Sequence, residues 1–169
     1  MNLEKVLIRK MNDEDYEIMA KWLSAEEVLE FYGDVNSPFN LEKVKEKYEP
    51  RISGEVPVNP YIVELGETPI GYMQKYSLSD EKKVEFGYSG HDKVYGIDQF
   101  IGKPKLFNKG IGTIMVRQFT DYIFDNTDAN VVVLDPEVSN VRAIKCYEKC
   151  GFSKVRLIEG RNKWLMECR

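Results

Sequence analysis

The 169-residue chain has little histidine and little cysteine, and this scarcity excludes several kinds of site. The only histidine is His91, and the three cysteines are Cys146, Cys150 and Cys168. They do not have zinc-ligand spacing, and they offer no Cys–His pair for covalent catalysis. Since Cys146 and Cys150 are four residues apart, they share one face of a helix, where we favour packing over a disulfide or a metal site. We therefore expect no metal.

Long apolar runs are also lacking. No stretch approaches the roughly 20 apolar residues that a membrane span requires, and residues 1–5 lack the apolar core of a signal peptide. We therefore expect a cytoplasmic protein with no membrane partner. The 24 basic and 28 acidic residues give a formal net charge of -4, the wrong sign for neutralising nucleic-acid phosphates. A cationic ligand is favoured instead, and no nucleic-acid partner is expected.

The sequence does contain the material for one globular domain over residues 1–169, with 43% hydrophobic and 12% aromatic residues. No repeat or Pro/Gly/Ser-rich linker divides it. The pattern predicts an α/β domain of the α+β kind, with helices beside a mixed sheet. Strands are expected at residues 6–8, 61–65, 70–76, 93–101, 131–134, 153–158 and 163–168.

Capping and breaking residues delimit the expected helices. They are a helix after an Asn12-Asp13 cap, residues 25–32 before Gly33, and residues 41–48 between an Asn40 cap and a Pro50 stop. A polar segment, 77–92, is expected to be a surface excursion. A long helix then carries Ile111, Met115, Phe119 and Tyr122 on its apolar side, and a short helix runs from Asn140 to about Cys150.

A glycine motif, Asn108-Lys109-Gly110-Ile111-Gly112-Thr113, lies between an expected strand and the long helix. Two glycines one residue apart let the backbone approach a ligand, and the helix N-terminus presents N–H groups to an anion such as a pyrophosphate. A tight turn that needs glycine for its own geometry is the equal alternative. The motif is neither a Walker loop nor a dinucleotide fingerprint, because no Gly-Lys-Ser/Thr follows and the third glycine would fall at Met115.

A second motif begins with Asp135-Pro136 and continues as Asn140-Val141-Arg142-Ala143-Ile144 and Tyr147-Glu148-Lys149-Cys150-Gly151-Phe152. Together with the glycine motif, it resembles the acetyl-CoA-binding half of the GCN5-related N-acetyltransferase (GNAT) superfamily, over about residues 93–152. The resemblance implies the GNAT fold, a central, mostly antiparallel sheet of about seven strands, with acetyl-CoA as co-substrate. Phe107 departs from the pattern, since the superfamily loop begins there with Arg or Gln, but backbone N–H groups can still bind phosphate.

Further segments resemble the aminoglycoside 6′-N-acetyltransferases, and the similarity covers nearly the whole chain. They are Trp22-Leu23 and residues 28–33, 60–62, 69–74, 96–102 and 134–136. The similar branch includes the acetyltransferase half of a bifunctional acetyltransferase-phosphotransferase, but we expect no phosphotransferase activity here. The resemblance implies direct acetyl transfer from acetyl-CoA to the 6′-amine of a cationic aminoglycoside, conferring resistance, by a monomer or homodimer. The alternatives are a GNAT enzyme for another amine, such as a protein N-terminus or small metabolite, and a non-catalytic acyl-CoA-binding module.

Asp98 and Asp135 are the candidate catalytic carboxylates. Asp98 interrupts an apolar strand, where a charge is costly unless it is paired or used. Asp135 ends the neighbouring strand, and ligands gather at the carboxyl ends of strands in open α/β sheets. We expect Asp98 to bind the ammonium and accept its proton while Asp135 orients the amine-bearing ring. A salt bridge to a lysine for Asp98, and a turn or cap role for Asp135, are the alternatives.

The resemblance implies roles for other side chains. Tyr147 is expected to protonate the CoA thiolate, with a core position as the alternative, and Asn140 either caps its helix or binds the pantetheine arm. The expected cofactor-binding residues are Gln99, Phe100, Ile101, Lys109, Gly110, Ile111, Gly112, Thr113, Asn140 and Lys149. Aromatic rings and carboxylates suit sugars and ammonium groups. The expected acceptor-binding residues are Tyr32, Tyr48, Glu55, Gln74, Tyr76, Asp98, Asp135 and Glu159.

Overall fold

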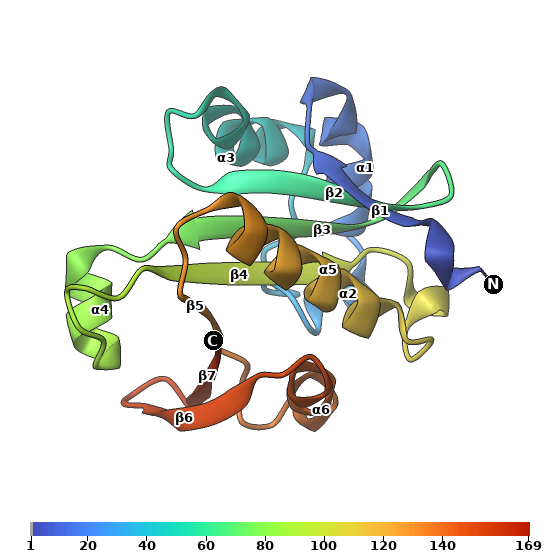
Figure 1. The fold of residues 1–169 in the computed structure, drawn as a ribbon. Coiled ribbons are helices and arrows are strands. Elements are labelled where there is room, and N and C mark those ends of the chain that lie inside the picture. Colours follow the sequence, from blue (N-terminus) through green and yellow to red (C-terminus); the bar gives the residue numbers. More distant parts are fainter. Residues whose placement is uncertain (1) are drawn as a thin grey trace. The chain divides into compact units, whose positions relative to one another are not determined.

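Seven strands form a mixed sheet in the computed structural model, which describes residues 2–169 (Figure 1). The strands are β1 (Val6–Lys10), β2 (Asn59–Leu65), β3 (Thr68–Ser77), β4 (Val94–Ile101), β5 (Val131–Leu134), β6 (Ser153–Ile158) and β7 (Lys163–Cys168). Their order is β1-β2-β3-β4-β5-β7-β6. β4 and β5 run parallel, whereas β1 with β2, β2 with β3, β5 with β7 and β6 with β7 are antiparallel. The predicted mixed, mostly antiparallel sheet is confirmed.

Six α-helices accompany the strands in the described part of the chain. They are α1 (Tyr16–Trp22), α2 (Glu26–Leu29), α3 (Leu41–Ser53), α4 (Asp80–Phe86), α5 (Ile111–Asn126) and α6 (Val141–Lys149). The predicted cap of α3 is confirmed, because the Asn40 side chain accepts a hydrogen bond from the Lys43 N–H at 2.9 Å. No helix within residues 2–169 has both the length and the apolar character needed to cross a bilayer.

The described chain groups into two compact units. Unit 1 comprises the residues up to Lys75 and Asp98–Gly112, and unit 2 comprises Tyr76–Ile97 and Thr113–Arg169. Because the boundaries fall inside β3 and β4, each of these strands contributes residues to both units. The single-domain span 1–169 stays a prediction.

Aromatic side chains dominate the core of unit 1. The Trp22 ring meets Phe100 edge-on with 6.0 Å between centroids, and Tyr72 stacks on Phe100 at 5.6 Å. Tyr48 of α3 is fully buried and meets Tyr72 edge-on at 5.3 Å. Such pairs stabilise a core beyond the area that they bury. Asp98 lies on β4 next to this cluster, because Phe100 is two residues further along the same strand.

The core of unit 2 lies around β5, whose four residues are all buried, as the apolar run predicts. Met115 and Phe119 of α5 are buried too. The prediction that Tyr122 completes the apolar side of α5 is wrong: its side chain is 41% exposed, and Ile123 is fully buried instead. The buried residues Met115, Val116, Phe119 and Ile123 centre the apolar face near Phe119, and Tyr122 lies at the edge of that face.

Pro50 does not end α3, which continues to Ser53 and stops at Gly54 in the left-handed conformation. Proline removes one helical hydrogen bond. Tertiary contacts hold the last turn nonetheless, since Arg51 donates a hydrogen bond to Gln74 and Ile52 packs against the unit 1 core. The second expected helix is shorter than predicted, because only Glu26–Leu29 of residues 25–32 is α-helical.

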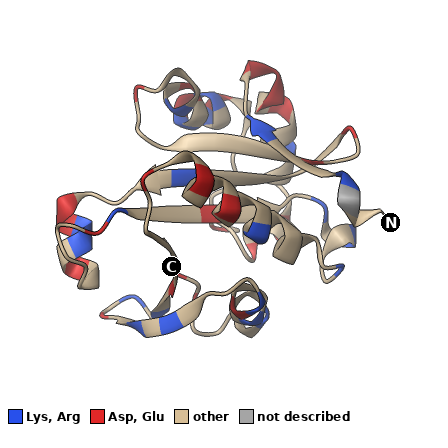
Figure 2. Cartoon of the chain, viewed as in Figure 1, with Lys and Arg blue, Asp and Glu red and all other residues tan. Residues whose placement is uncertain are grey.

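The expected surface excursion over residues 77–92 contains α4, a helix that the sequence pattern did not predict. The Ser79 side chain caps the helix by accepting from the Lys82 N–H at 3.2 Å, and Leu78 and Phe86 are buried in the unit 2 core. Figure 2 shows acidic and basic residues interleaved on α4. The many charged residues mask the helical pattern in the sequence, but the buried side chains of Leu78 and Phe86 hold the segment against the core of unit 2.

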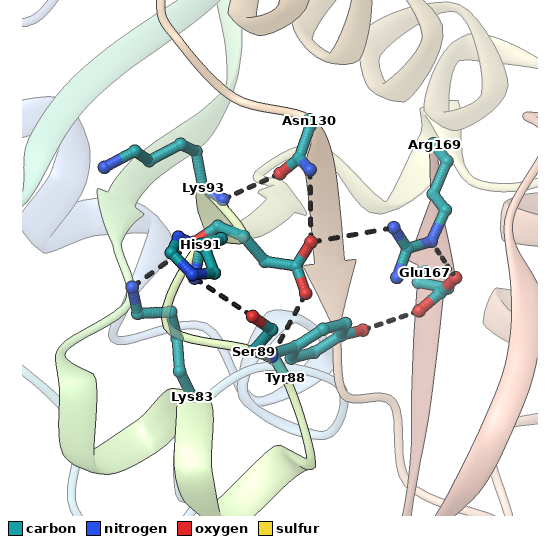
Figure 3. A network of polar contacts seen from close by, with 9 residues as sticks. Lys83, Tyr88, Ser89, His91, Lys93, Asn130, Glu167 and Arg169 are labelled. Carbon is teal, nitrogen blue, oxygen red and sulfur yellow. Dashed lines mark hydrogen bonds and ion pairs between the residues drawn. The ribbon is translucent and has the colours of Figure 1, made fainter.

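The residues after α4 are held by a polar network around Asp92 (Figure 3). The Asp92 carboxylate accepts hydrogen bonds from the Asn130 amide and the Ser89 N–H, both at 3.1 Å, and lies 3.9 Å from Arg169. The Lys83 ammonium donates to the Asp92 carbonyl oxygen at 3.2 Å. These hydrogen bonds, first the one from Asn130, lower the pKa of Asp92. The segment therefore has fixed polar partners within unit 2.

Gly102→Ala is expected to destabilise the protein by about 1–3 kcal/mol, the usual range for overpacking. A β-carbon at Gly102 would lie 2.3 Å from the buried Trp22 ring. Urea unfolding followed by fluorescence measures the effect. The matched control is Gly90→Ala, where a β-carbon meets no atom within 4 Å. Equal midpoints for Gly102→Ala and wild type would show that Trp22 shifts at no cost.

Candidate active site

A chain of hydrogen bonds fixes Asp98 in unit 1. Gln74 of β3 donates from Nε2 to Asp98 Oδ2 at 2.8 Å. The Gln74 Oε1 atom accepts from the Tyr72 hydroxyl at 2.7 Å and from the Arg51 guanidinium. Because two donors meet Oε1, the amide has one orientation, and its N–H faces Asp98. The half-buried carboxylate is thus held on a rigid strand by a neutral donor.

Three tyrosines beside this network have raised pKa values. Burial raises the pKa of Tyr48 to about 12, and it also raises the pKa of Tyr32 and Tyr72. The Tyr32 ring lies 4.6 Å from Phe100, centroid to centroid. Gln74 and Asp98 are therefore brought together as neighbours in unit 1, with an aromatic wall that includes Tyr32 and the fully buried Tyr48.

Arg51 is a member of this network that sequence reasoning missed. Its guanidinium carbon lies 5.3 Å from the centre of the Tyr48 ring, in a cation–π contact, while it donates to Gln74. The sequence carries no signal for it, because Arg51 follows the proline at which the helix was expected to end. Glu55, an expected acceptor residue, lies exposed in the turn after α3.

The glycine motif has the backbone of a tight turn at the start of α5. Asn108 and Gly110 have φ angles of 61° and 83°, and the helix begins at the next residue, Ile111. Left-handed backbone explains the glycine at 110, where a β-carbon would make only an ordinary contact with the Leu3 side chain at 3.9 Å. The first N–H groups of a 16-residue helix have no intrahelical acceptor, so the turn presents them at a ready anion site. Lys109 is exposed beside it.

The strand residues expected to bind the cofactor, Gln99, Phe100 and Ile101, all lie on β4. The Phe100 side chain is buried in the unit 1 core, whereas Gln99 and Ile101 are half-buried. The Phe100 ring is therefore not available to a ligand.

α6 carries the remaining residues of the second motif. Asn140 caps it, since its side chain accepts from the Ala143 N–H at 3.2 Å. The half-buried Tyr147 ring meets Phe152 edge-on at 6.4 Å between centroids. Lys149 ends the helix, and its carbonyl oxygen accepts from the Arg117 guanidinium at 2.6 Å. The cap role of Asn140 is observed, and its contact with pantetheine stays a prediction.

Asp135 lines a cavity of about 220 Å³ in unit 2. The lining residues are Tyr76, Leu78, Lys82, Phe86, Val133, Leu134, Asp135, Arg161 and Leu165. Asp135 lies at the end of β5, as predicted, and one of its oxygens is 3.9 Å from the Lys163 ammonium. The expected acceptor residue Glu159 lies exposed in the turn between β6 and β7.

Two basic side chains in this cavity were missed by sequence reasoning. Glu85 neutralises both: it lies 2.9 Å from Lys82 and 3.1 Å from Arg161. Lys82 was missed because it belongs to α4, which was not expected, and Arg161 lies in the turn between β6 and β7. The Tyr76 ring covers Gly96, where a β-carbon would lie 2.5 Å from it, so the glycine is required for Tyr76 to hold its position.

Among the side chains that the structure describes, no group of three or more His, Cys, Asp or Glu could hold a metal ion.

Comparison with known proteins gives a consistent result. The family model described as acetyltransferase (GNAT) domain matches residues 11–159. An aminoglycoside N(6′)-acetyltransferase type 1 of Klebsiella pneumoniae is 32% identical over 151 residues, which are 89% of this chain and 75% of that protein.

Two solved structures are similar over nearly the whole chain. The structure of AAC(6′)-Ib in complex with paromomycin and acetyl-CoA has a TM-score of 0.80 and 30% identity, covering 97% of this chain and 93% of that one. The structure of aminoglycoside acetyltransferase AAC(6′)-Ib in complex with coenzyme A and kanamycin has a TM-score of 0.76 and 30% identity, covering 96% and 93%. With the family model, the seven-stranded mixed sheet and the glycine turn before α5, these matches show that the chain belongs to the GNAT acetyltransferase family.

Proposed function

We propose that this protein transfers the acetyl group of acetyl-CoA to the 6′-amine of aminoglycoside antibiotics and thereby confers resistance. The observation that carries the proposal is the fixed Asp98 carboxylate, in a chain 32% identical over 89% of its length to an aminoglycoside N(6′)-acetyltransferase. Similar structures that contain acetyl-CoA or coenzyme A together with an aminoglycoside support it.

Asp98 activates the amine in this mechanism. At neutral pH a primary amine is mostly ammonium, and it attacks a thioester only after it loses a proton. Asp98 binds the ammonium and accepts that proton, directly or through a water molecule. The Gln74 N–H occupies one carboxylate oxygen of Asp98, which leaves the other oxygen for the amine.

The acceptor's rings and further charges are bound by the aromatic and acidic side chains. Asp135 orients the amine-bearing ring, and its 3.9 Å separation from Lys163 is long enough for an incoming ammonium to compete. Tyr32 and Tyr76 supply aromatic surface, whereas Tyr48, predicted to bind the acceptor, is fully buried in the core of unit 1. Glu55 and Glu159 are exposed carboxylates for the outer ammonium groups.

Acetyl-CoA supplies the activated thioester. The turn before α5, with Lys109, Gly110, Ile111, Gly112 and Thr113, fits its pyrophosphate, because the free N–H groups and the positive helix end attract an anion. Asn140 and Lys149 add contacts from α6. Backbone N–H groups of Gln99, Phe100 and Ile101 stabilise the oxyanion, and Tyr147 protonates the departing sulfur. No covalent acetyl-enzyme is needed.

We also propose that the protein acts in the cytoplasm, as a monomer or homodimer, without a nucleic-acid or membrane partner. Its three cysteines are free thiols, as is usual in a reducing compartment.

A thiol-release assay with acetyl-CoA tests the activity across kanamycin, tobramycin, amikacin and gentamicin, and on an aminoglycoside with a 6′-hydroxyl. We expect turnover with the 6′-amino compounds. Inactivity toward all of them, with turnover of peptide N-termini or small amines, would instead support the alternative GNAT enzyme. Binding of acetyl-CoA without release of thiol from any amine would support a non-catalytic module.

Asp98→Asn is expected to lower kcat for kanamycin by at least about 10²-fold, because an amide cannot accept the proton. Acetyl-CoA affinity, measured by calorimetry, should stay near that of the wild type. Asp125→Asn, on the exposed side of α5, is the control. Kanamycin acetylation at the wild-type rate would remove Asp98 from the mechanism.

Tyr147→Phe is expected to slow the chemical step by about 10²-fold while leaving acetyl-CoA affinity unchanged, because only the proton donor is lost. Single-turnover kinetics by rapid quench isolates that step. Tyr122→Phe, at an exposed tyrosine, is the control. An unaltered single-turnover rate would reduce Tyr147 to a packing partner of Phe152.

Gln74→Met is expected to lower kcat/KM by about 10-fold to 100-fold, since a hydrogen bond to a charged group contributes about 1.5–3 kcal/mol. The change keeps the side-chain volume but removes the donor that holds Asp98. Steady-state kinetics checks it, with urea unfolding to show that the variant is folded. Gln118→Met, at an exposed glutamine of α5, is the control.

A further inference from the structure

Two cysteines and a threonine form a cluster in unit 2 that the acetyl-transfer mechanism does not use. Cys146 Sγ lies 3.4 Å from the Thr113 hydroxyl oxygen. Cys150 donates from Sγ to the Thr113 carbonyl oxygen, also at 3.4 Å. Both thiols are free and half-buried. We call Thr113, Cys146 and Cys150 the thiol cluster.

The two thiols of the cluster are electrostatically unequal. The neighbouring Cys150 thiol lowers the pKa of the Cys146 thiol, and the Thr113 hydroxyl and the charges of Lys149 and Arg117 act in the same direction against burial. The same interaction between the two thiols raises the pKa of Cys150. The Arg117 guanidinium is anchored 2.6 Å from the Lys149 carbonyl oxygen, which keeps this cation at the end of α6. These surroundings favour a thiolate on Cys146 over one on Cys150.

Cys168 provides an internal contrast. Its sulfur lies close to Gly151, 3.7 Å from where a β-carbon would stand, so it is near the same helix end. Burial, followed by the negative charges of Asp121 and Glu167, raises the pKa of the Cys168 thiol. Reactivity toward electrophiles follows thiolate character. The surroundings of Cys146 thus favour its thiolate, and those of the nearby Cys168 disfavour it.

We propose that Cys146 and Cys150 form a peroxide-sensitive dithiol site that switches this protein between an active, reduced form and a less active, oxidised form. The Cys146 thiolate attacks a hydroperoxide, an S–O bond forms and the O–O bond breaks, and the distal oxygen leaves as an alcohol or water. Cys150 then loses its proton and attacks the sulfenic sulfur, and the hydroxyl leaves as water when the S–S bond forms. The two thiols lose two electrons, and the peroxide takes them up.

The end of α6 can accommodate the disulfide. Side chains four residues apart on a helix have β-carbons about 5–6 Å apart, and a disulfide needs about 3.5–4.5 Å, so the two cysteines must move together. Cys150 follows the last helical residue, Lys149, and precedes Gly151, which has a φ of 94°. The movement therefore falls on the helix end. A disulfide strained in this way is readily reduced, as a reversible switch requires.

The consequence for acetyl transfer rests on the proposed function. Thr113 is in the first turn of α5, directly after the glycines that we assign to the pyrophosphate, and both of its sulfur contacts change when the disulfide forms. Tyr147 is next to Cys146 on the turn that must move. Loss of two weak hydrogen bonds is expected to lower acetyl-CoA affinity by about tenfold.

The chemistry is tested without any activity assay. The full-length reduced protein is treated with hydrogen peroxide, the remaining thiols are alkylated, and peptides are mapped by mass spectrometry. We expect a disulfide between Cys146 and Cys150, with Cys168 alkylated. In Cys150→Ser, dimedone should trap a sulfenic acid on Cys146. Iodoacetamide should label Cys146 at least about tenfold faster than Cys168 at neutral pH.

Matched variants separate the outcomes. Cys168→Ser should keep the full peroxide response, whereas Cys146→Ser should lose it. A disulfide that includes Cys168, or equal alkylation rates at Cys146 and Cys168, would overturn the site.

Calorimetry with acetyl-CoA before oxidation, after oxidation and after dithiothreitol tests the switch. Unchanged affinity and turnover in the disulfide form would overturn it. If the reduced protein acetylates no aminoglycoside, the proposed function fails, but the peptide map and the acetyl-CoA affinity still decide the dithiol proposal.

Discussion

The buried side-chain amide of Gln74 needs hydrogen-bond partners for both its oxygen and its nitrogen, and this requirement fixes the position of Asp98 in unit 1. The amide oxygen accepts hydrogen bonds from the Tyr72 hydroxyl and the Arg51 guanidinium. This fixes the orientation of the amide, so that its N–H donates to Asp98. One neutral side chain thereby connects α3, β3 and β4. The carboxylate that we assign to proton transfer is held by a donor that adds no charge of its own, so its negative charge stays available to an ammonium.

In unit 2, one residue likewise contacts two partners: the Thr113 hydroxyl lies next to Cys146 Sγ, and the Thr113 carbonyl oxygen accepts a hydrogen bond from Cys150 Sγ. This ties the start of α5 to the end of α6. In our proposals, cofactor binding, thiolate protonation and the state of the cysteines depend on one small set of contacts.

Local signals in the sequence were sufficient for most of the fold and for the family. The last two strands have the expected bounds, the Asn40 and Asn140 caps accept the expected N–H groups, and β5 is buried throughout. These features depend on residues that are close together in the sequence, so hydrophobic periodicity and capping rules predict them. Asp98 stood out for a similarly local reason, because a charge interrupts an apolar strand.

By itself the sequence determined the order of the seven strands, the place of the glycine motif before the long helix and the resemblance to the GNAT family, since each is carried by local sequence patterns. Only the tertiary structure decided that α3 runs through Pro50, that residues 80–86 form a helix, and that Arg51 and Thr113 have polar partners far along the chain. The physical reason is the range of the interactions. A packed core or a buried hydrogen bond can outweigh local propensity, and its partners are distant in the sequence.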